Sequence, residues 1–183
     1  MIIPIIGMFG CGKTTLIRER FIYKSKKRKL IYTTKPSDYS KPVCKINFSV
    51  INDLRLFVLE AIKLTDTLCI IDEAATCIPF KQPEINNLKK AISEDEKESY
   101  EKMFMEWLAN SREYNNLILP AYHDFTELPL WLLKKSNYLI RFKTNDQYDI
   151  QARRFNTFPN LVNSFLSKEQ PDNFGEYDEL KIR

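Results

Sequence analysis

The segment GMFGCGKTT, residues 7–15, is the feature that most restricts how this chain can fold. It holds three of the only four glycines in 183 residues. Gly7, Gly12, Lys13 and Thr14 match the spacing G-x-x-x-x-G-K-[ST], with an apolar run in front and a helical pattern behind. Glycine lets backbone amides approach an anion closely, because no Cβ stands in the way. The segment therefore predicts a phosphate-binding loop between a buried strand and a helix.

The residue types of this loop predict how it would hold a nucleoside triphosphate. Lys13 would reach the β and γ phosphates, and Thr14 would ligate Mg²⁺. The N-terminus of the following helix adds partial positive charge. The residues expected to line the nucleotide are Gly7, Gly10, Cys11, Gly12, Lys13, Thr14 and Thr15. ATP and Mg²⁺ are the predicted ligands, and a glycine turn followed by Lys-Thr by chance is the alternative.

An acidic pair, Asp72 and Glu73, follows the apolar run LCII. At the carboxyl end of a strand, both acids would face the ligand crevice of an open α/β sheet. Successive residues of a strand point in different directions, so the two carboxylates would take different roles. We expect Asp72 to hold Mg²⁺ through water and Glu73 to polarise an attacking water. The alternative is an acid pair at the start of a helix opened by Ala74 and Ala75.

Strand-like and helix-like segments alternate along the chain. Strands are expected at 2–7, 29–34, 43–48, 67–75, 116–123, 138–143 and 148–155. Helices are expected at 13–23, 49–64, 84–114, 127–135 and 159–167, the second of them capped by Ser49. The alternation predicts an α/β fold, the three-layer P-loop NTPase sandwich. Its sheet would be mostly parallel, with a C-terminal antiparallel hairpin at the edge. Pro4 cannot donate to a ladder and predicts a missing neighbour there.

Composition sets the broad class of the protein. The length predicts a single domain, 1–167, followed by a polar tail, 168–183. A zinc site is not expected, because the cysteines form no CxxC pair and the chain has one histidine. No secretory signal or apolar run of membrane-spanning length is visible, which predicts a cytoplasmic protein without a transmembrane segment. For a viral protein, this would mean the host cytoplasm or the virion.

Four segments together resemble the FtsK/HerA superfamily of P-loop ATPases: GMFGCGKTT, LCIIDEAA, SREYNNLILPAYH and ELPLWLLKKSNYLIRF. They span about residues 5–143. The closest likeness is to the genome-packaging ATPases of membrane-containing icosahedral viruses. A second likeness is to the Zot-type assembly ATPases of filamentous phages. The first two segments occur in many P-loop families, whereas the last two are more telling but looser.

The resemblance implies roles for two further residues. Arg112 matches the family's arginine finger, which acts in trans in a neighbouring subunit's site. His123 stands where the family most often has a glutamine that senses the γ phosphate, so this chain departs from the pattern there. The alternatives are an arginine at a helix C-terminus and an exposed strand-end histidine beside Asp124. A finger in trans requires a homo-oligomeric ring, and the family's rings are typically hexameric.

The family's partner implies double-stranded DNA as the substrate that is moved, with a capsid or portal component as a further partner. The densest basic run, KSKKRK at 24–29, could meet phosphates, although such a run is more often a solvated helix end. Weaker candidates are Lys134, Lys135, Arg153 and Arg154.

The sequence thus predicts an Mg²⁺-dependent ATP hydrolase that drives DNA translocation, a viral genome-packaging motor. The first alternative is a P-loop kinase of a nucleoside or metabolite, for which 32–42 could form a binding loop. A Zot-like phage assembly ATPase and a nucleotide-gated interaction module without rapid hydrolysis are the others.

Overall fold

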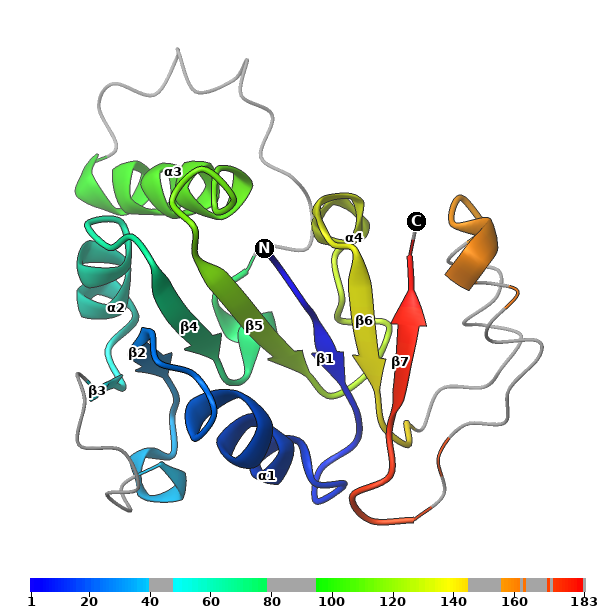
Figure 1. The fold of residues 1–183 in the computed structure, drawn as a ribbon. Helices are drawn as coiled ribbons and strands as arrows, with labels where there is room; N and C mark the ends of the chain where they lie inside the picture. Colours follow the sequence, from blue (N-terminus) through cyan, green and yellow to red (C-terminus); the bar gives the residue numbers. More distant parts are fainter. Residues whose placement is uncertain are drawn as a thin grey trace.

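The computed structural model describes residues 1–39, 48–78, 95–144, 156–161, 163, 171 and 173–182. Within these residues one sheet has the strand order β3-β2-β4-β5-β1-β6-β7 (Figure 1). The strands are β1 (Ile5–Ile6), β2 (Arg28–Tyr32), β3 (Phe48–Ile51), β4 (Thr67–Ile71), β5 (Leu117–Tyr122), β6 (Tyr138–Arg141) and β7 (Asp178–Lys181). The helices are α1 (Lys13–Leu16), α2 (Leu54–Ala61), α3 (Asp95–Ala109) and α4 (Leu130–Lys135). Every pairing is parallel except that of β6 with β7.

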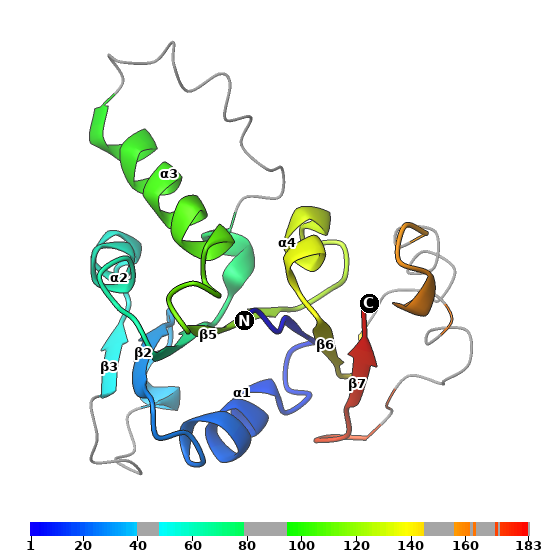
Figure 2. The same cartoon turned by 45° about the horizontal axis from the view of Figure 1, so that its top comes forward.

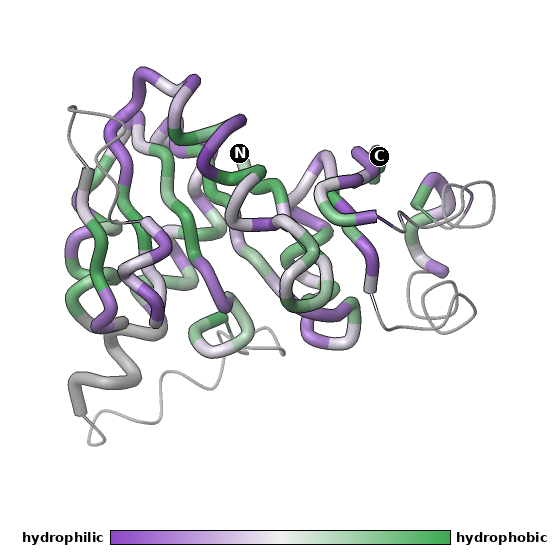
Figure 3. Tube along the Cα trace, turned by 90° about the horizontal axis from the view of Figure 1, so that it is seen from below, coloured by the Kyte–Doolittle hydropathy of each residue, from purple (hydrophilic) through white to green (hydrophobic). Residues whose placement is uncertain are grey.

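Helices cover both faces of the sheet, as the alternating pattern predicted. In Figure 2, α1 lies on one face and α2, α3 and α4 on the other. Alternate residues of β4 serve the two cores: Cys69 and Ile71 pack with α2 and α3, whereas Leu68 and Ile70 pack with the α1 side. A strand buried on both faces must be apolar throughout, which explains the run TLCII and the hydrophobic colouring of the central strands in Figure 3.

Strand β1 lies in the interior of the sheet, between β5 and β6. Ile5 is in register with Ala121 on one side and Ile140 on the other. The prediction that Pro4 marks a missing neighbour is therefore wrong. Pro4 stands just before β1 and contributes its carbonyl, which accepts from the Ile140 N–H at 2.9 Å. A proline has no N–H and can only accept a hydrogen bond through its carbonyl, which is tolerated at the start of a strand.

The helix behind the glycine loop continues from α1 through the π-helical segment η1 (Ile17–Ile22), so the helix expected at 13–23 is confirmed. The helix expected from a Ser49 cap begins later. Ser49 belongs to β3, where it is in register with Leu30. The cap is Asp53, whose side chain accepts from the Leu56 N–H at 2.8 Å.

The antiparallel edge that the sequence predicted is present, and its described partner strand is β7. That strand comes from the segment 168–183 expected to be a polar tail, and the expected hairpin strand 148–155 lies outside the described residues. The Arg141 side chain, which is fully buried, binds Asp178 at 2.5 Å from Nη2 to Oδ2. A buried guanidinium requires a partner, so this ion pair, together with the buried Leu180 and Ile182, holds a polar segment on the sheet.

Asp178→Ala should lower the free energy of unfolding by about 3–5 kcal/mol, because it leaves a buried cation without its carboxylate. Glu179→Ala is the matched control on the same strand. Glu179 binds Arg20 with both side chains partly exposed, at 44% and 36%, so its loss should cost only about 0.2–1 kcal/mol. Urea denaturation of the two variants measures both values. Equal losses would contradict a structural role for the buried pair.

Candidate functional site

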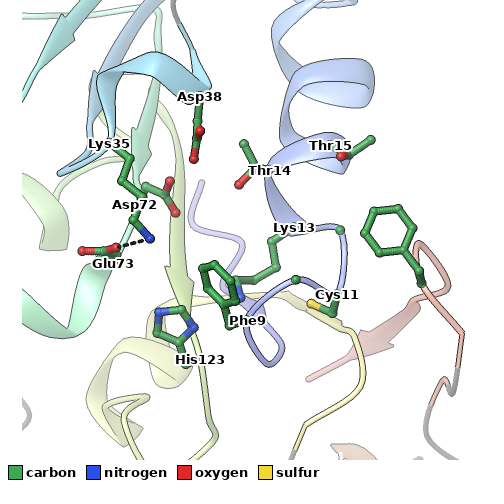
Figure 4. A pocket seen from close by; sticks show the side chains of 13 residues that line it. Phe9, Cys11, Lys13, Thr14, Thr15, Lys35, Asp38, Asp72, Glu73 and His123 are labelled. Atoms are coloured by element: carbon green, nitrogen blue, oxygen red, sulfur yellow. Dashed lines mark ion pairs between the residues drawn. The ribbon is translucent and has the colours of Figure 1, made fainter.

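A pocket opens at the carboxyl edge of the sheet (Figure 4). Gly7 follows β1, Asp72 follows β4 and His123 follows β5, and these three strands are neighbours in the order β4-β5-β1. The edge where parallel strands end is where α/β sheets bind ligands. The side chains and glycines around the pocket are Phe9, Gly10, Cys11, Gly12, Lys13, Thr14, Thr15, Lys35, Asp38, Asp72, Glu73, His123 and Phe174.

Two glycines of the 7–15 loop cannot carry a side chain. A Cβ on Gly7 would stand 2.5 Å from the Phe142 Cβ and 2.6 Å from the Cys11 Sγ. Gly12 has a φ of +107°, and its Cβ would stand 3.2 Å from the Gly175 Cα. The loop therefore packs closely against the residues that follow β6 and against the segment before β7. The helix behind it starts without a side-chain cap, so its first N–H groups remain available to an anion.

Lys13 lies at the floor of this loop and is nearly fully buried. Its ammonium donates to the Gly7 carbonyl and, at 3.1 Å, to the Met8 carbonyl. Burial lowers the pKa of Lys13, while Cys11 and Asp72 act in the opposite direction. A cation held by carbonyls of its own loop is already positioned for a phosphate that enters the pocket.

Asp72 is held by groups from the segment after β2. Its Oδ2 accepts from the Tyr39 hydroxyl at 3.0 Å and from the Thr33 hydroxyl at 3.5 Å. Tyr39 is itself buried, and Thr14, the other predicted metal ligand, lines the same pocket as Asp72. Burial raises the pKa of Asp72, although the Tyr39 hydrogen bond works against that rise. A carboxylate and a hydroxyl meeting in one pocket are oxygen ligands of the kind that Mg²⁺ prefers.

Glu73 points away from Asp72, as expected for neighbouring residues at a strand end. Its Oε2 accepts from the Thr34 hydroxyl at 2.7 Å, and its Oε1 lies 3.8 Å from the Lys35 ammonium (Figure 4). The backbone of Glu73 is left-handed, with φ at +60°. That conformation costs a residue with a Cβ about 1–2 kcal/mol, and the turns at Asp66 and Asn115 adopt it too. A one-turn helix (Ala74–Thr76) follows the pair directly. The two acids therefore stand both at the end of a strand and at the start of a helix, which were the two alternatives that the sequence left open.

His123 lines the same pocket, one residue beyond β5. Its backbone N–H donates to Glu127 Oε2 at 2.9 Å, which fixes the turn after the strand. The predicted loop, acidic pair and strand-end residue are thus brought together in one place. Whether His123 senses a phosphate stays a prediction.

Arg112 lies at the end of the sheet opposite the pocket, where the parallel strands begin. It is exposed and donates at 2.6 Å to Asn137, the residue that directly precedes β6. The basic run 24–29 reaches this edge too, because Lys27 binds Asp66 at 2.8 Å in front of β4. Lys29 from the same run is buried and donates to the Ser25 carbonyl. Arg112 therefore does not reach the pocket of its own chain, and a role in trans stays a prediction.

Sequence reasoning missed several residues around the pocket: Phe9, Thr33, Thr34, Asp38, Tyr39 and Phe174. Thr33, Thr34 and Tyr39 follow β2, the strand next to β4, and polar residues after a strand were a usable signal. The segment 32–42 was considered only as a kinase binding loop. For Phe174 the sequence carried no signal, because a short edge strand returns it to the loop.

No known family profile matches the chain, and no curated protein is significantly similar to it in sequence. Among the described residues, no helix is long and apolar enough to cross a membrane.

Solved structures do resemble it. The genome packaging NTPase B204 of Sulfolobus turreted icosahedral virus 2, in complex with ATP-gammaS, aligns with a TM-score of 0.65 at 18% identity, over 100% of this chain and 96% of B204. The conjugation coupling protein TcpA of pCW3 aligns at 0.59 and 13% identity, over 99% of this chain and 59% of TcpA. The N-terminal domain of zonular occludens toxin from Neisseria meningitidis reaches only 0.46 at 17% identity, over 79% and 77%.

The likeness to viral packaging ATPases that the sequence predicted is thus found in the structure. At these identities the first two alignments establish a common fold, the P-loop sandwich, and the third is too weak to add to it.

Tyr39→Phe should raise the pKa of Asp72 further, because the variant keeps the buried ring and removes the hydroxyl that stabilises the ionised carboxylate. Titration of the Asp72 carboxyl carbon by ¹³C NMR measures this. Divalent cations bind only the ionised form, so the variant should lose Mn²⁺ at a higher pH than the wild type as the pH falls. Thr33→Val removes the longer of the two hydrogen bonds and should move the pKa less. If the pKa of Asp72 did not change in Tyr39→Phe, the Tyr39 hydroxyl would not be the group that stabilises the ionised carboxylate.

Proposed function

We propose that this chain is an Mg²⁺-dependent ATPase that drives DNA translocation as a genome-packaging motor. The observation that carries the proposal is the meeting of the 7–15 loop, Asp72 and Glu73 in one pocket at the carboxyl edge of the sheet. The shared fold with a packaging NTPase that binds ATP-gammaS supports it. Cytoplasmic or virion location, and docking on a capsid or portal component, belong to the same proposal.

The residues of the pocket fit the steps of phosphoryl transfer to water. The loop amides and Lys13 bind the phosphate chain and neutralise the charge that develops on it. Thr14 and Asp72 would hold Mg²⁺, which would supply positive charge to offset that of the phosphates. Glu73 orients the attacking water: Thr34 engages Oε2, and Oε1, which faces the Lys35 ammonium at 3.8 Å, keeps lone pairs that can accept a hydrogen bond from water. His123 donates toward the γ phosphate.

A P-loop kinase is the second candidate, because Lys35 and Asp38 line the pocket beside the acidic pair. They come from the segment that the sequence offered as a substrate-binding loop. A kinase transfers the phosphate to a small molecule and needs no glutamate to polarise water. Glu73 therefore separates the two candidates.

Glu73→Gln should preserve ATP binding and lower turnover by about 10²–10⁴-fold, the usual contribution of a general base. Wild-type phosphate release should rise on addition of double-stranded DNA, and this rise should weaken with salt because phosphate contacts do. The turnover of the variant and the response of the wild type to DNA are both measured as phosphate release with and without DNA.

Glu60→Gln, on α2 away from the pocket, is the matched control and should hydrolyse ATP at the wild-type rate. Unchanged turnover in Glu73→Gln would remove Glu73 as the base. A wild-type rate of ATP hydrolysis that does not change when DNA is added would favour the kinase or a nucleotide-gated switch over a motor.

Arg112→Ala alone should abolish hydrolysis if subunits complete each other's sites in a ring. Its own loop remains intact, so mixing it with Lys13→Ala, which supplies Arg112 but cannot bind phosphate, should restore part of the activity. Activity is measured across mixing ratios at constant total protein, together with the assembly size in the presence of an ATP analogue. Absence of rescue at every ratio would refute a finger in trans, and the assembly size would fix whether the ring is a hexamer.

A further inference from the structure

The turn before β7 is fastened to the phosphate-binding loop. The Gly175 N–H donates to the Cys11 carbonyl at 3.0 Å, and a Cβ added to Gly12 would stand 3.2 Å from the Gly175 Cα. Within the turn, Asn173 donates to the Glu176 carboxylate at 2.8 Å, and Gly175 takes a left-handed φ of +83°. The turn is therefore a defined structure whose position depends on the loop.

This turn presents a phenylalanine to the pocket. Phe174 is 72% exposed yet lines the pocket. Tyr177, three residues on, behaves differently: its ring packs at 5.5 Å from that of Phe142 and takes part in the core. Exposing most of a phenylalanine ring has a cost in water that a bound planar group would remove.

The position of Phe174 fits one end of a nucleotide. Asp72 and Glu73 mark where the terminal phosphate would lie. Figure 4 shows the C-terminal segment, in faint red, on the far side of the 7–15 loop from these acids. A nucleotide with its phosphates in the loop and its γ phosphate toward Glu73 would direct its base toward this segment.

A second exposed aromatic ring, that of Phe9, lines a different side of the pocket. Phe9 is 75% exposed, but the Lys35 ammonium sits 4.9 Å from its ring centroid, and Lys35 is also the partner of Glu73. Phe9 therefore belongs to the acidic side of the pocket. The two rings are near the two ends that a bound nucleotide would have.

We propose that Phe174 is the nucleobase platform of this site, stacking on the base of the nucleoside triphosphate whose phosphates lie in the 7–15 loop. This inference rests on the proposed nucleotide-binding function. Every base has a π face, so a stacking platform of this kind accepts different bases. Affinity for ATP and for GTP should therefore depend on Phe174 alike.

The test compares ATP with inorganic tripolyphosphate, which offers the same phosphates without a base. By titration calorimetry in Mg²⁺, Phe174→Ala should raise the Kd for ATP about 5–100-fold and leave the Kd for tripolyphosphate unchanged. In Phe174→Trp, ATP should quench the added tryptophan emission and tripolyphosphate should not. Both variants change an exposed side chain and should keep the wild-type thermal transition. Tyr138→Ala, at an exposed aromatic outside the pocket, is the matched control and should bind ATP as the wild type does.

The outcomes separate this inference from the function on which it rests. If the wild type binds tripolyphosphate and Phe174→Ala keeps the wild-type ratio of the two Kd values, the platform is refuted and the phosphate loop stands. If Phe9→Ala rather than Phe174→Ala weakens ATP binding relative to tripolyphosphate binding, the base lies at the Phe9 end of the pocket and the assignment of Phe174 is overturned. If the wild type binds neither ligand, both the proposed function and the platform fall.

Discussion

Parallel pairing of β1 between β5 and β6 is the constraint on which the rest of the structure depends. It places the residue after β1, Gly7, beside the ends of its neighbours, so the glycine loop, the acids after β4 and the histidine after β5 share one edge. The same pairing sends the starts of the strands, with Arg112 and the basic run, to the other edge. One edge is thus equipped for phosphate chemistry, and the other carries exposed cations.

Much of this arrangement could be predicted because its signals are local. The glycine spacing reflects steric needs within a few residues, and the apolar run before Asp72 reflects a strand buried on both faces. Helix starts were predicted less well. Ser49 and Asp53 are both acceptable caps, and only the pairing of β3 with β2, which is not a local property, decides between them.

What the sequence could not provide were contacts between distant segments. Tyr39 reaches Asp72 because β2 lies next to β4, and nothing near Tyr39 in the sequence predicts that neighbour. The polar composition of 168–183 predicted a tail, but in the edge strand Asp178 binds a buried guanidinium while Leu180 and Ile182 are buried in the core. One buried ion pair and two buried apolar side chains outweighed the average polarity of the segment.

The interior position of β1 also sets the order in which the protein can be assembled during synthesis. The partners of Ile5, Ala121 and Ile140, are made more than a hundred residues after it, and Gly175, which contacts the loop, is made later still. Pairings so far apart in sequence carry a large loop-closure entropy and form slowly. The glycine loop is therefore translated before the strands and the turn that surround it, and it reaches its final shape only after they are made.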